Sequence, residues 1–349
     1  MIHCPSTSST AMQPKKNANQ ISTSSKNETI VLVLTLVITA GLVGTSIWWL
    51  TRQSGIKIGN LQPNQSNQST QSTTETFAQV QGVPKGVFNY GGSTTWASIR
   101  RDLDPAIQTV WPQFRLRYIS SENGKPGSGT GIRMLLDNQL SIAQSSRSLK
   151  DTEFQQAQQR GFTLKEIPVA IDGIVVAVNP SLNIPGLTID QLNDINAGKI
   201  TNWSQVGGPD LKIKRYALDG DPGVNFEVVS NPTDALRRVA AELGGMSQVS
   251  APLALSQCTV KVLPLGRNSD ELVLPYKLPL VPLDQCPAKR NQVNTQAIQS
   301  GKYPLTRRLL VVVKKDGQID QQAGEAYANL LLTAQGQELI EKAGFVPIR

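Results

Sequence analysis

The sequence is poor in the residue types from which many enzyme active sites are built. Its 349 residues include one histidine, His3 in a polar N-terminal tail, and three cysteines, Cys4, Cys258 and Cys286. This composition excludes a Ser-His-Asp or Cys-His triad, and any site with several histidine ligands, from the folded part. Three cysteines also cannot build a four-cysteine zinc site. We therefore expect a protein that is not an enzyme and that holds no metal and no cofactor.

Charged residues make up only 17% of the chain and aromatic residues 5%. The net charge is +8, of which the first 77 residues contribute +3 and the remainder +5. Nucleic-acid-binding proteins usually concentrate Lys and Arg in a patch, and this chain has no long basic run, so we expect no nucleic-acid partner. A mildly positive domain suits a small anion.

One long hydrophobic run lies near the N-terminus. Residues 30–50, IVLVLTLVITAGLVGTSIWWL, contain no charged side chain. As a helix they would span about 30 Å, the thickness of the hydrocarbon core of a bilayer. The run is longer than the apolar region of a cleaved signal peptide, and it ends in two tryptophans, which suit the membrane interface. We therefore expect a retained single-pass transmembrane anchor.

The segments on either side of this run predict its orientation and the start of the folded part. Residues 1–29 carry slightly more basic groups than the segment after the run, which favours a cytoplasmic tail. The rest of the chain would then lie in the periplasm or outside the cell. Residues 60–79 contain 15 Ser, Thr, Asn or Gln among 20, too polar a composition to form a core. We therefore predict a flexible, disordered linker over 51–85.

Beyond residue 85 the sequence alternates between segments typical of strands and of helices. Strands are predicted at 88–92, 114–120, 140–144, 211–218, 259–266 and 309–313, and as two runs within 166–180. Helices are predicted at 96–110, from 128, from 152, from 188, at 231–245, and as a final pair at 323–332 and 335–344. This alternation indicates an α/β architecture with a largely parallel sheet.

Local signals refine the helix predictions. Pro105 interrupts the apolar stripe of 96–110, so we expect a kink there or a restart capped by Asp104. Thr152-x-x-Gln155 and Thr188-x-x-Gln191 are predicted capping boxes. Asn231, followed by a proline, is the predicted cap of the helix in 231–245.

Four short polar loops lie where predicted strands end and helices begin. They are 92–95 (Gly-Ser-Thr-Thr), 127–130 (Gly-Ser-Gly-Thr), 145–148 (Ser-Ser-Arg-Ser) and 219–223 (Asp-Gly-Asp-Pro-Gly). In open α/β sheets ligands bind beyond the carboxyl ends of the strands, and N–H groups at helix starts bind anions. One such loop is more often an ordinary helix cap. Four of them in one chain, one with an arginine, predict an oxyanion site.

The sequence also resembles a known family. GSGTGIRMLLDNQLSIAQSSRSL (127–149) resembles the first lobe of bacterial periplasmic phosphate-binding proteins. Residues 167–208 are similar to the stretch entering their second lobe, and 303–349 to their C-terminal return. The resemblance covers about 86–349. It implies a type II two-lobed, hinged periplasmic-binding-protein fold, with lobe 1 at 86–172 and 303–349 and lobe 2 at 173–302.

The resemblance implies a function as well. It implies a membrane-tethered, monomeric solute-binding protein that captures phosphate or a related oxyanion between its lobes for an ABC permease. The family's first three anion loops map onto Ser93, Thr94, Thr95, Ser128, Gly129, Thr130, Ser145, Ser146 and Arg147.

The fourth loop departs from the family pattern. Where relatives have an Arg and then Ser-Gly-Thr, this chain has Asp219, Asp221 and Gly223, and Arg215 is out of register. The two carboxylates either accept a proton from a protonated ligand or repel a dianion, or the loop is an ordinary turn. In the third loop the pair Ser146 and Arg147 lacks the carboxylate that distinguishes phosphate from sulfate.

Other function classes stay open at this point. A signalling or scaffolding receptor domain of the same fold, with altered or lost anion binding, is favoured by the changed fourth loop. A phosphate-ester hydrolase is disfavoured because histidine and a carboxylate cluster with metal-ligand spacing are absent. Arg147 has the alternative of a surface pair with Asp151.

The two cysteines of the exported part predict a covalent link. Cys258 and Cys286 flank a proline-rich segment, and oxidation is favoured outside the cytoplasm. We therefore predict a disulfide between them, with two free thiols as the alternative.

Overall fold

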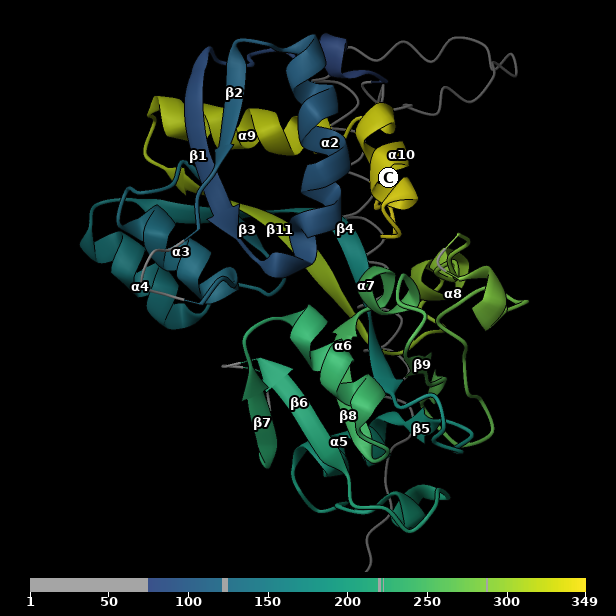
Figure 1. The fold of residues 1–349 in the computed structure, drawn as a ribbon. Coiled ribbons are helices and arrows are strands. Elements are labelled where there is room, and N and C mark those ends of the chain that lie inside the picture. The colour runs from purple at the N-terminus through teal and green to yellow at the C-terminus, as the bar shows by residue number, and fades with distance from the viewer. Residues whose placement is uncertain (1–74, 121–124, 219–220, 222, 287) are drawn as a thin grey trace, which may run out of the picture. The chain divides into compact units, whose positions relative to one another are not determined.

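The structure is a computed structural model that describes residues 75–120, 125–218, 221, 223–286 and 288–349 (Figure 1). The predicted tail (1–29), the predicted anchor (30–50) and most of the predicted linker lie outside the described residues. Within the part of the chain that is described, no helix is both long enough and apolar enough to cross a bilayer.

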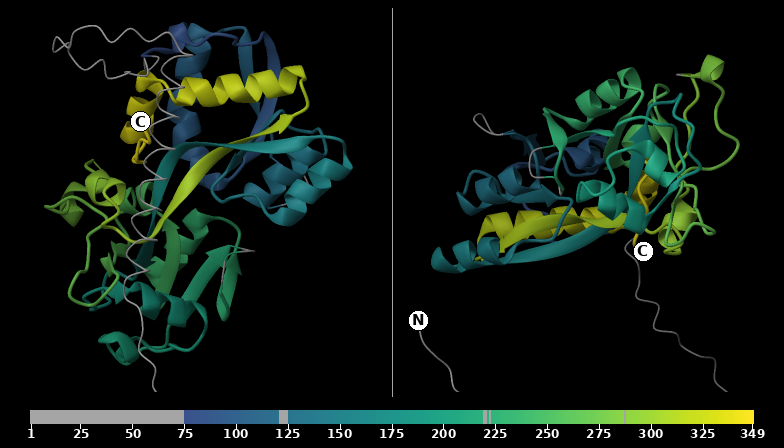
Figure 2. Two further views of the ribbon diagram at one scale, coloured as in Figure 1. Left: turned by 180° about the vertical axis from the view of Figure 1, so that it is seen from behind. Right: turned by 90° about the horizontal axis from the view of Figure 1, so that it is seen from below.

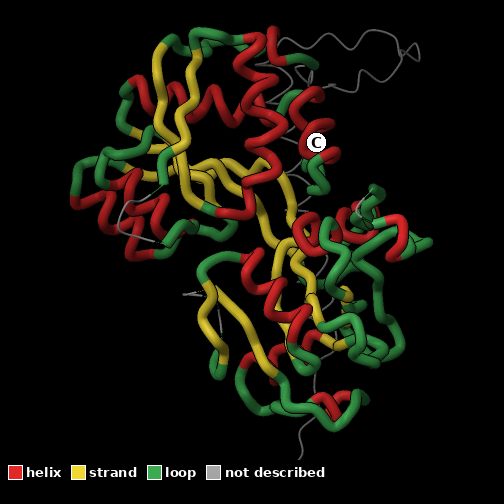
Figure 3. The backbone as a smooth tube through the Cα atoms, viewed as in Figure 1, coloured by secondary structure: helices red, strands yellow, loops and turns green. Residues whose placement is uncertain are grey.

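Strands and helices alternate along the described chain, as Figure 3 shows. The strands are β1 Gly86–Gly92, β2 Phe114–Tyr118, β3 Ile142–Ser145, β4 Thr163–Val178, β5 Leu187–Thr188, β6 Lys214–Leu218, β7 Phe226–Val229, β8 Gly245–Ser250, β9 Lys261–Val262, β10 Leu265–Gly266 and β11 Thr306–Lys315. The α-helices are α2 Ala97–Val110, α3 Ser128–Leu136, α4 Asp151–Gln159, α5 Ile189–Asn196, α6 Pro232–Ala241, α7 Ala251–Leu255, α8 Thr295–Gln299, α9 Ile319–Leu331 and α10 Ala334–Lys342. Short 3-10 helices are η1 Phe77–Gln79, η2 Thr94–Trp96, η3 Trp203–Val206 and η4 Leu283–Gln285.

The main sheet has the strand order β2-β1-β3-β11-β4-β8-β6-β7, and β9 also pairs with β4. Near one end β1 is parallel to β2 and β3, and near the other end β6 is parallel to β7 and β8. In the middle β11 is antiparallel to β3 and β4, and β4 is antiparallel to β8. The sheet is therefore mixed, and the prediction of a largely parallel sheet is wrong because two long strands cross the molecule in opposite directions.

The strands β4 and β11 join two lobes, as the left view of Figure 2 shows. Residues 163–173 of β4 pair with β11, and residues 174–178 pair with β8. Each lobe has its own core, one containing Trp96 and Tyr327 and the other containing Trp203 and Met246. This confirms a two-lobed α/β fold. The boundaries at 172/173 and 302/303 remain predictions.

A glycine in the middle of β4 explains one wrong prediction. The run 166–180 does not break at Asp172-Gly173 but continues as one strand. A Cβ on Gly173 would lie 2.6 Å from Cδ1 of Ile298, so the glycine allows α8 to pack closely against the strand. The segment 259–266 was predicted as one strand but forms two. Pro264 separates β9 from β10, and these two strands pair with different partners.

Helix starts test the capping predictions. The box at Thr188 and Gln191 is confirmed, because each side chain accepts a hydrogen bond from the backbone N–H of the other, at 3.1 and 2.9 Å. The cap at Asn231 is confirmed too. The box at Thr152 is wrong, since α4 begins at Asp151 and the Glu153 carboxylate accepts from the N–H of Lys150.

The helix α2 tests the prediction made for Pro105. The helix α2 runs from Ala97 to Val110 with Pro105 inside it, so of the two alternatives expected there, a kink or a restart capped by Asp104, the restart is wrong. Leu103 and Ile107 on either side of the proline are fully buried, and this packing holds the helix together.

Cys258 and Cys286 are joined by a disulfide, as predicted.

Candidate functional site

A cleft of about 1830 Å³ is lined by residues of both lobes. Of the twelve residues predicted to bind a ligand, nine line it: Ser93, Thr94, Thr95, Ser128, Gly129, Thr130, Ser146, Arg147 and Asp221. Asp219 lies outside the described residues. Ser145 and Gly223 are described but do not line the cleft.

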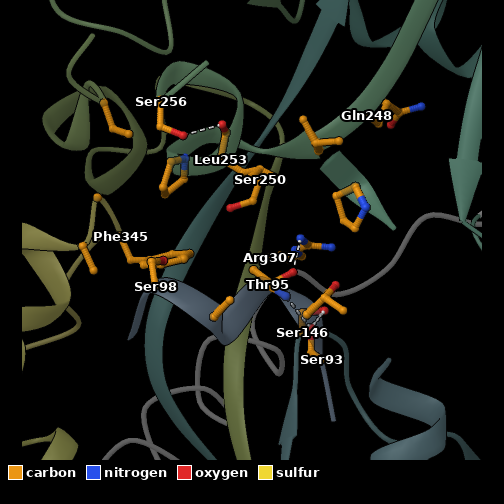
Figure 4. A pocket seen from close by; sticks show the side chains of 18 of the residues that line it. Ser93, Thr95, Ser98, Ser146, Gln248, Ser250, Leu253, Ser256, Arg307 and Phe345 are labelled. Atoms are coloured by element: carbon orange, nitrogen blue, oxygen red, sulfur yellow. Dashed lines mark hydrogen bonds between the residues drawn. The ribbon is translucent and has the colours of Figure 1, made fainter. Parts of the chain in front are cut away.

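Three loops of the first lobe bring their serine hydroxyls together. The Oγ of Ser93 donates to the Oγ of Ser146 at 3.0 Å, and the Oγ atoms of Ser128 and Ser146 are 3.3 Å apart. The backbone N–H of Ser146 also donates to the Oγ of Ser128 at 3.0 Å. Figure 4 shows Ser93 and Ser146 side by side at the wall of the cleft. These loops come from three separate stretches of sequence and form one cluster of hydroxyl groups.

Close packing of α3 on β1 makes this cluster possible. A Cβ on Gly131 would lie 2.5 Å from the Cα of Gly92, so the helix can approach the strand this closely only without a side chain. The first turn of α3 consists of Ser128, Gly129 and Thr130, whose N–H groups precede the first intrahelical bonds and face no helical acceptor. Such N–H groups, together with the serine hydroxyls, are suited to an anion.

Arg147 lines the cleft, but its charge is shared. The Nη2 and Nη1 atoms of its guanidinium bond both carboxylate oxygens of Glu153, at 2.7 and 2.9 Å. These hydrogen bonds raise the pKa of Arg147. The acidic partner of Arg147 is therefore Glu153, six positions on, whose carboxylate meets both guanidinium nitrogens. The alternative partner, Asp151, is not the one used. Ser145 is fully buried and its hydroxyl donates to the carbonyl of Arg147, so it shapes the loop.

Arg307, at the start of β11, is a cleft residue that the sequence analysis missed. Its Nε donates to Oδ2 of Asp172 at 2.9 Å, and its Nη2 donates to Oγ1 of Thr95 at 2.9 Å (Figure 4). Asp172 on β4 has no exposed surface, and its Oδ1 accepts from the Oγ of Ser250 at 2.6 Å. Burial raises the pKa of Asp172, and the charge of Arg307 opposes this rise.

The side chains of Thr95, Arg307, Asp172 and Ser250 form one network, here called the Arg307 network. It connects a loop of the first lobe, both crossing strands and the second lobe. Its sequence signal was a pair of basic residues, Arg307 and Arg308, directly before the apolar run 309–313, together with a single acidic residue, Asp172, inside the otherwise uncharged run 167–178. Both strands are predictable as buried elements, but their pairing is not.

The fourth loop is partly described. Asp221 lines the cleft, and one of its carboxylate oxygens accepts from the N–H of Leu218 at 2.7 Å. Burial raises the pKa of Asp221, whereas the bond from Leu218 and the charge of Arg307 lower it. Arg215 lies away from the cleft and bonds the carbonyl of Val224. Gly223 packs on Arg215, since a Cβ there would lie 2.8 Å from its Nη1.

The cleft is lined by more basic than acidic side chains. The basic ones are Arg101, Lys125, Arg133, Arg147, Lys277, Arg290, Arg307 and Lys342, and the acidic ones are Asp221, Glu338 and Glu341. Such a surplus attracts small anions. Across the described ranges of the chain, no cluster of three His, Cys, Asp or Glu side chains could hold a metal ion.

A network of polar side chains supports the loop that contains Ser93. The Nη1 of Arg100 donates to the carbonyl of Ser93 and to Oε1 of Gln144, at 3.2 and 2.8 Å. Gln144 in turn donates to the hydroxyl of Tyr327, which donates to the carboxylate of Asp104. The network fixes the position of the loop through side chains of α2, β3 and α9.

Asp104 makes the stability of this lobe depend on pH. Burial raises its pKa to about 6, although hydrogen bonds from Tyr90 and Tyr327 oppose the rise. Between about pH 4 and pH 6 the folded chain therefore holds a proton that the unfolded chain has lost, so the unfolding free energy falls as pH rises. The expected loss is about 1–3 kcal/mol, measurable by urea denaturation at several pH values.

The variant Asp104→Asn is expected to remove this slope, because an amide does not titrate. Asp102→Asn on the same helix is the matched control, since Asp102 pairs with Arg101 at the surface. A wild-type slope in Asp104→Asn would show that another group titrates.

Comparison with known proteins places the chain among binding proteins. A family described as "PBP superfamily domain" matches residues 64–335. The chain is 25% identical over 274 residues to the phosphate-binding protein PstS of Borreliella burgdorferi, covering 75% of this chain and 90% of that one. It is 26% identical over 265 residues to PstS of Staphylococcus haemolyticus, covering 75% and 81%.

Solved structures share the fold. A putative phosphate ABC transporter substrate-binding protein with bound phosphate from Clostridium perfringens superposes with a TM-score of 0.59 at 20% identity, covering 76% of this chain and 100% of that one. An ABC-type phosphate transport receptor from Vibrio cholerae gives 0.55 at 23% identity, covering 75% and 100%.

Proposed function

Because the chain belongs to the PBP superfamily, we propose that it is an extracytoplasmic solute-binding protein. It captures phosphate or a related oxyanion for an ABC transporter. The observation that carries the proposal is the meeting of three serine hydroxyls with the Arg307 network in one basic cleft. The names of the relatives support phosphate as the anion.

The first lobe would hold the anion before the lobes close. The hydroxyls of Ser93, Ser128 and Ser146 and the N–H groups at the start of α3 would donate to its oxygens. Each such bond is charge-assisted, which makes it roughly twice as strong as a neutral one. Arg307 would supply the positive charge, because its guanidinium is positioned by Asp172 and Thr95.

The second lobe would contribute Asp221 when the lobes close. A carboxylate can accept the proton of monohydrogen phosphate, and sulfate has no such proton to donate at neutral pH. Asp221 is thereby proposed as the residue that favours phosphate over sulfate. This replaces the acceptor that the third loop lacks.

Four features complete the proposal. Residues 30–50 would anchor the protein in the inner membrane, the linker 51–85 would give the domain reach, and an ABC permease would receive the anion. The binding unit would act as a monomer.

Titration calorimetry on the purified full-length chain tests the function. We expect one phosphate per chain and at least tenfold weaker sulfate binding, and Asp221→Asn is expected to bring the two affinities together. If neither anion binds at millimolar concentration, the alternative applies: a signalling or scaffolding domain of this fold without anion binding.

A further inference from the structure

Arg147 is held at both of its ends. At the backbone, its N–H donates to the Oγ of Ser145 at 3.2 Å, and its carbonyl accepts from the same Oγ at 2.6 Å. At the far end, its guanidinium bonds both carboxylate oxygens of Glu153 and the carbonyl of Ser148. Ser145 is fully buried, and the side chain of Glu153 is only 13% exposed. The arginine therefore has a fixed orientation at the wall of the cleft.

Glu153 is itself fixed by the start of α4. It is the third residue of that helix, and its carboxylate folds back to accept from the N–H of Lys150 at 2.8 Å. Burial alone would raise the pKa of Glu153, but the bonds from Arg147 and Lys150 outweigh burial and lower the pKa. The carboxylate is therefore charged at neutral pH, and it bonds Arg147 as a fixed part of the helix terminus.

These partners use only part of the guanidinium, which has five N–H donors in one plane. Nη1 gives one proton to Glu153 and one to the carbonyl of Ser148, and Nη2 gives one proton to Glu153. The N–H of Nε and the second N–H of Nη2 have no partner among the residues that the structure describes. These two donors share one edge of the plane, and such an edge fits two oxygens of an oxyanion.

The guanidinium lies beside the cluster formed by the hydroxyls of Ser93, Ser128 and Ser146, here called the serine cluster. A Cβ on Gly129 would lie 3.4 Å from Nη2 of Arg147, so the guanidinium packs against the first turn of α3. The same turn begins with Ser128, whose Oγ accepts from the N–H of Ser146. Arg147 and the serine cluster therefore line the same stretch of the cleft wall.

We propose that Glu153 is a positioning residue for the anion site: it holds one edge of Arg147 and so directs the other edge, Nε and Nη2, at two oxygens of the bound anion. This inference rests on the proposed function and adds Arg147 to the groups that hold phosphate. Monohydrogen phosphate has three oxygens without a proton. They accept from Arg147, Arg307 and the serine cluster, while the fourth oxygen donates its proton to Asp221.

Charge and orientation give opposite effects when Glu153 loses its charge. A carboxylate beside the site repels an anion, so the loss of its charge alone would strengthen binding. The loss of a fixed Arg147 would weaken binding, because the side chain would have to be ordered when the anion arrives. The proposal requires that the loss of orientation has the larger effect, so the sign of the change in affinity tests it.

Titration calorimetry with inorganic phosphate on the full-length chain measures this sign. Glu153→Gln is expected to weaken phosphate binding about three- to tenfold, the cost of ordering one long side chain. The amide oxygen can still accept from the N–H of Lys150, but the amide cannot accept two bonds from Arg147. Asp151→Asn is the matched control, because it removes the same charge from the first turn of the same helix without touching a bond to Arg147. It is expected to change the affinity less than about twofold.

Variants of the arginine separate positioning from a structural role. Arg147→Lys keeps the charge but has no planar edge, and it is expected to weaken phosphate binding at least about fivefold. In a chain that already carries Arg147→Ala, Glu153→Gln is expected to change the affinity less than about twofold, because Glu153 acts through the arginine. A role of Glu153 in the structure of α4 alone would weaken binding equally with and without Arg147.

The outcomes separate this inference from the proposed function. Tighter phosphate binding in Glu153→Gln overturns the positioning role, because the carboxylate would then act only through its charge. Wild-type affinity in Arg147→Lys overturns the assigned edge of the guanidinium. Both results leave the phosphate receptor standing, whereas failure of the wild-type chain to bind phosphate overturns the proposed function and this inference with it.

Discussion

Replacing Arg307 by alanine is expected to weaken anion binding about 10- to 100-fold and to lower the unfolding free energy by about 3–5 kcal/mol. The binding loss corresponds to one hydrogen bond from a charged group, about 1.5–3 kcal/mol. The stability loss arises because Asp172 has no exposed surface and would be left as a buried charge without its partner. Calorimetry and urea denaturation measure the two effects.

Two further variants separate binding from stability. Arg308→Ala removes the same charge one residue further along β11, where the side chain is exposed, and is expected to stay within about 0.5 kcal/mol of wild type. The double variant Asp172→Asn, Arg307→Gln removes both charges of the pair, including the buried one of Asp172, and is expected to recover most of the stability without recovering anion binding. Wild-type affinity in the double variant would show that Arg307 does not bind the anion.

Gly131→Ala is expected to lower the unfolding free energy by about 1–3 kcal/mol, although alanine is the better helix former. The new Cβ would lie 2.5 Å from the Cα of Gly92, where only backbone could move. The helix α3 would have to shift and take Ser128 away from Ser146, so we expect at least tenfold weaker phosphate binding.

The matched control lies at the start of the same helix. A Cβ on Gly127 would have no atom within 4 Å, and the residue has an extended φ of 168°. Gly127→Ala is therefore expected to leave stability and binding close to wild type. If the two alanine variants behave alike in denaturation and calorimetry, the close contact of α3 with β1 does not position the serine cluster.

The first three loops of the site were predictable because their chemistry is local. Hydrogen-bond donors can be recognised within four residues of sequence where a strand ends in Gly-Ser-Thr or Ser-Ser-Arg, or where a helix begins with Ser-Gly-Thr. The rule that strand ends meet at one edge then brings Ser93, Ser128 and Ser146 together. The box at Thr188 was predictable for the same reason, since both of its hydrogen bonds join residues three positions apart.

Arg307 was not predictable in this way, because its partners are far from it in sequence. Thr95 lies 212 positions away and Asp172 lies 135 positions away. The partner of Arg147 was also decided by geometry, since α4 places Glu153 rather than Asp151 against the guanidinium. The resemblance to binding proteins indicated two lobes but not that β4 crosses between them as one unbroken strand.

The sequence by itself determined the alternation of strands and helices, the positions of the hydroxyl-bearing loops and the pair of cysteines, because these depend on periodicity and on neighbouring residues. Only the tertiary structure decided which hydroxyls face the cleft and which are used internally. Ser146 and Ser250 both end or follow a strand, yet one meets two other serines and the other donates to a buried carboxylate. A side chain bonds whichever partner the fold brings within about 3 Å, and for Ser250 that partner, Asp172, lies on another strand 78 residues away.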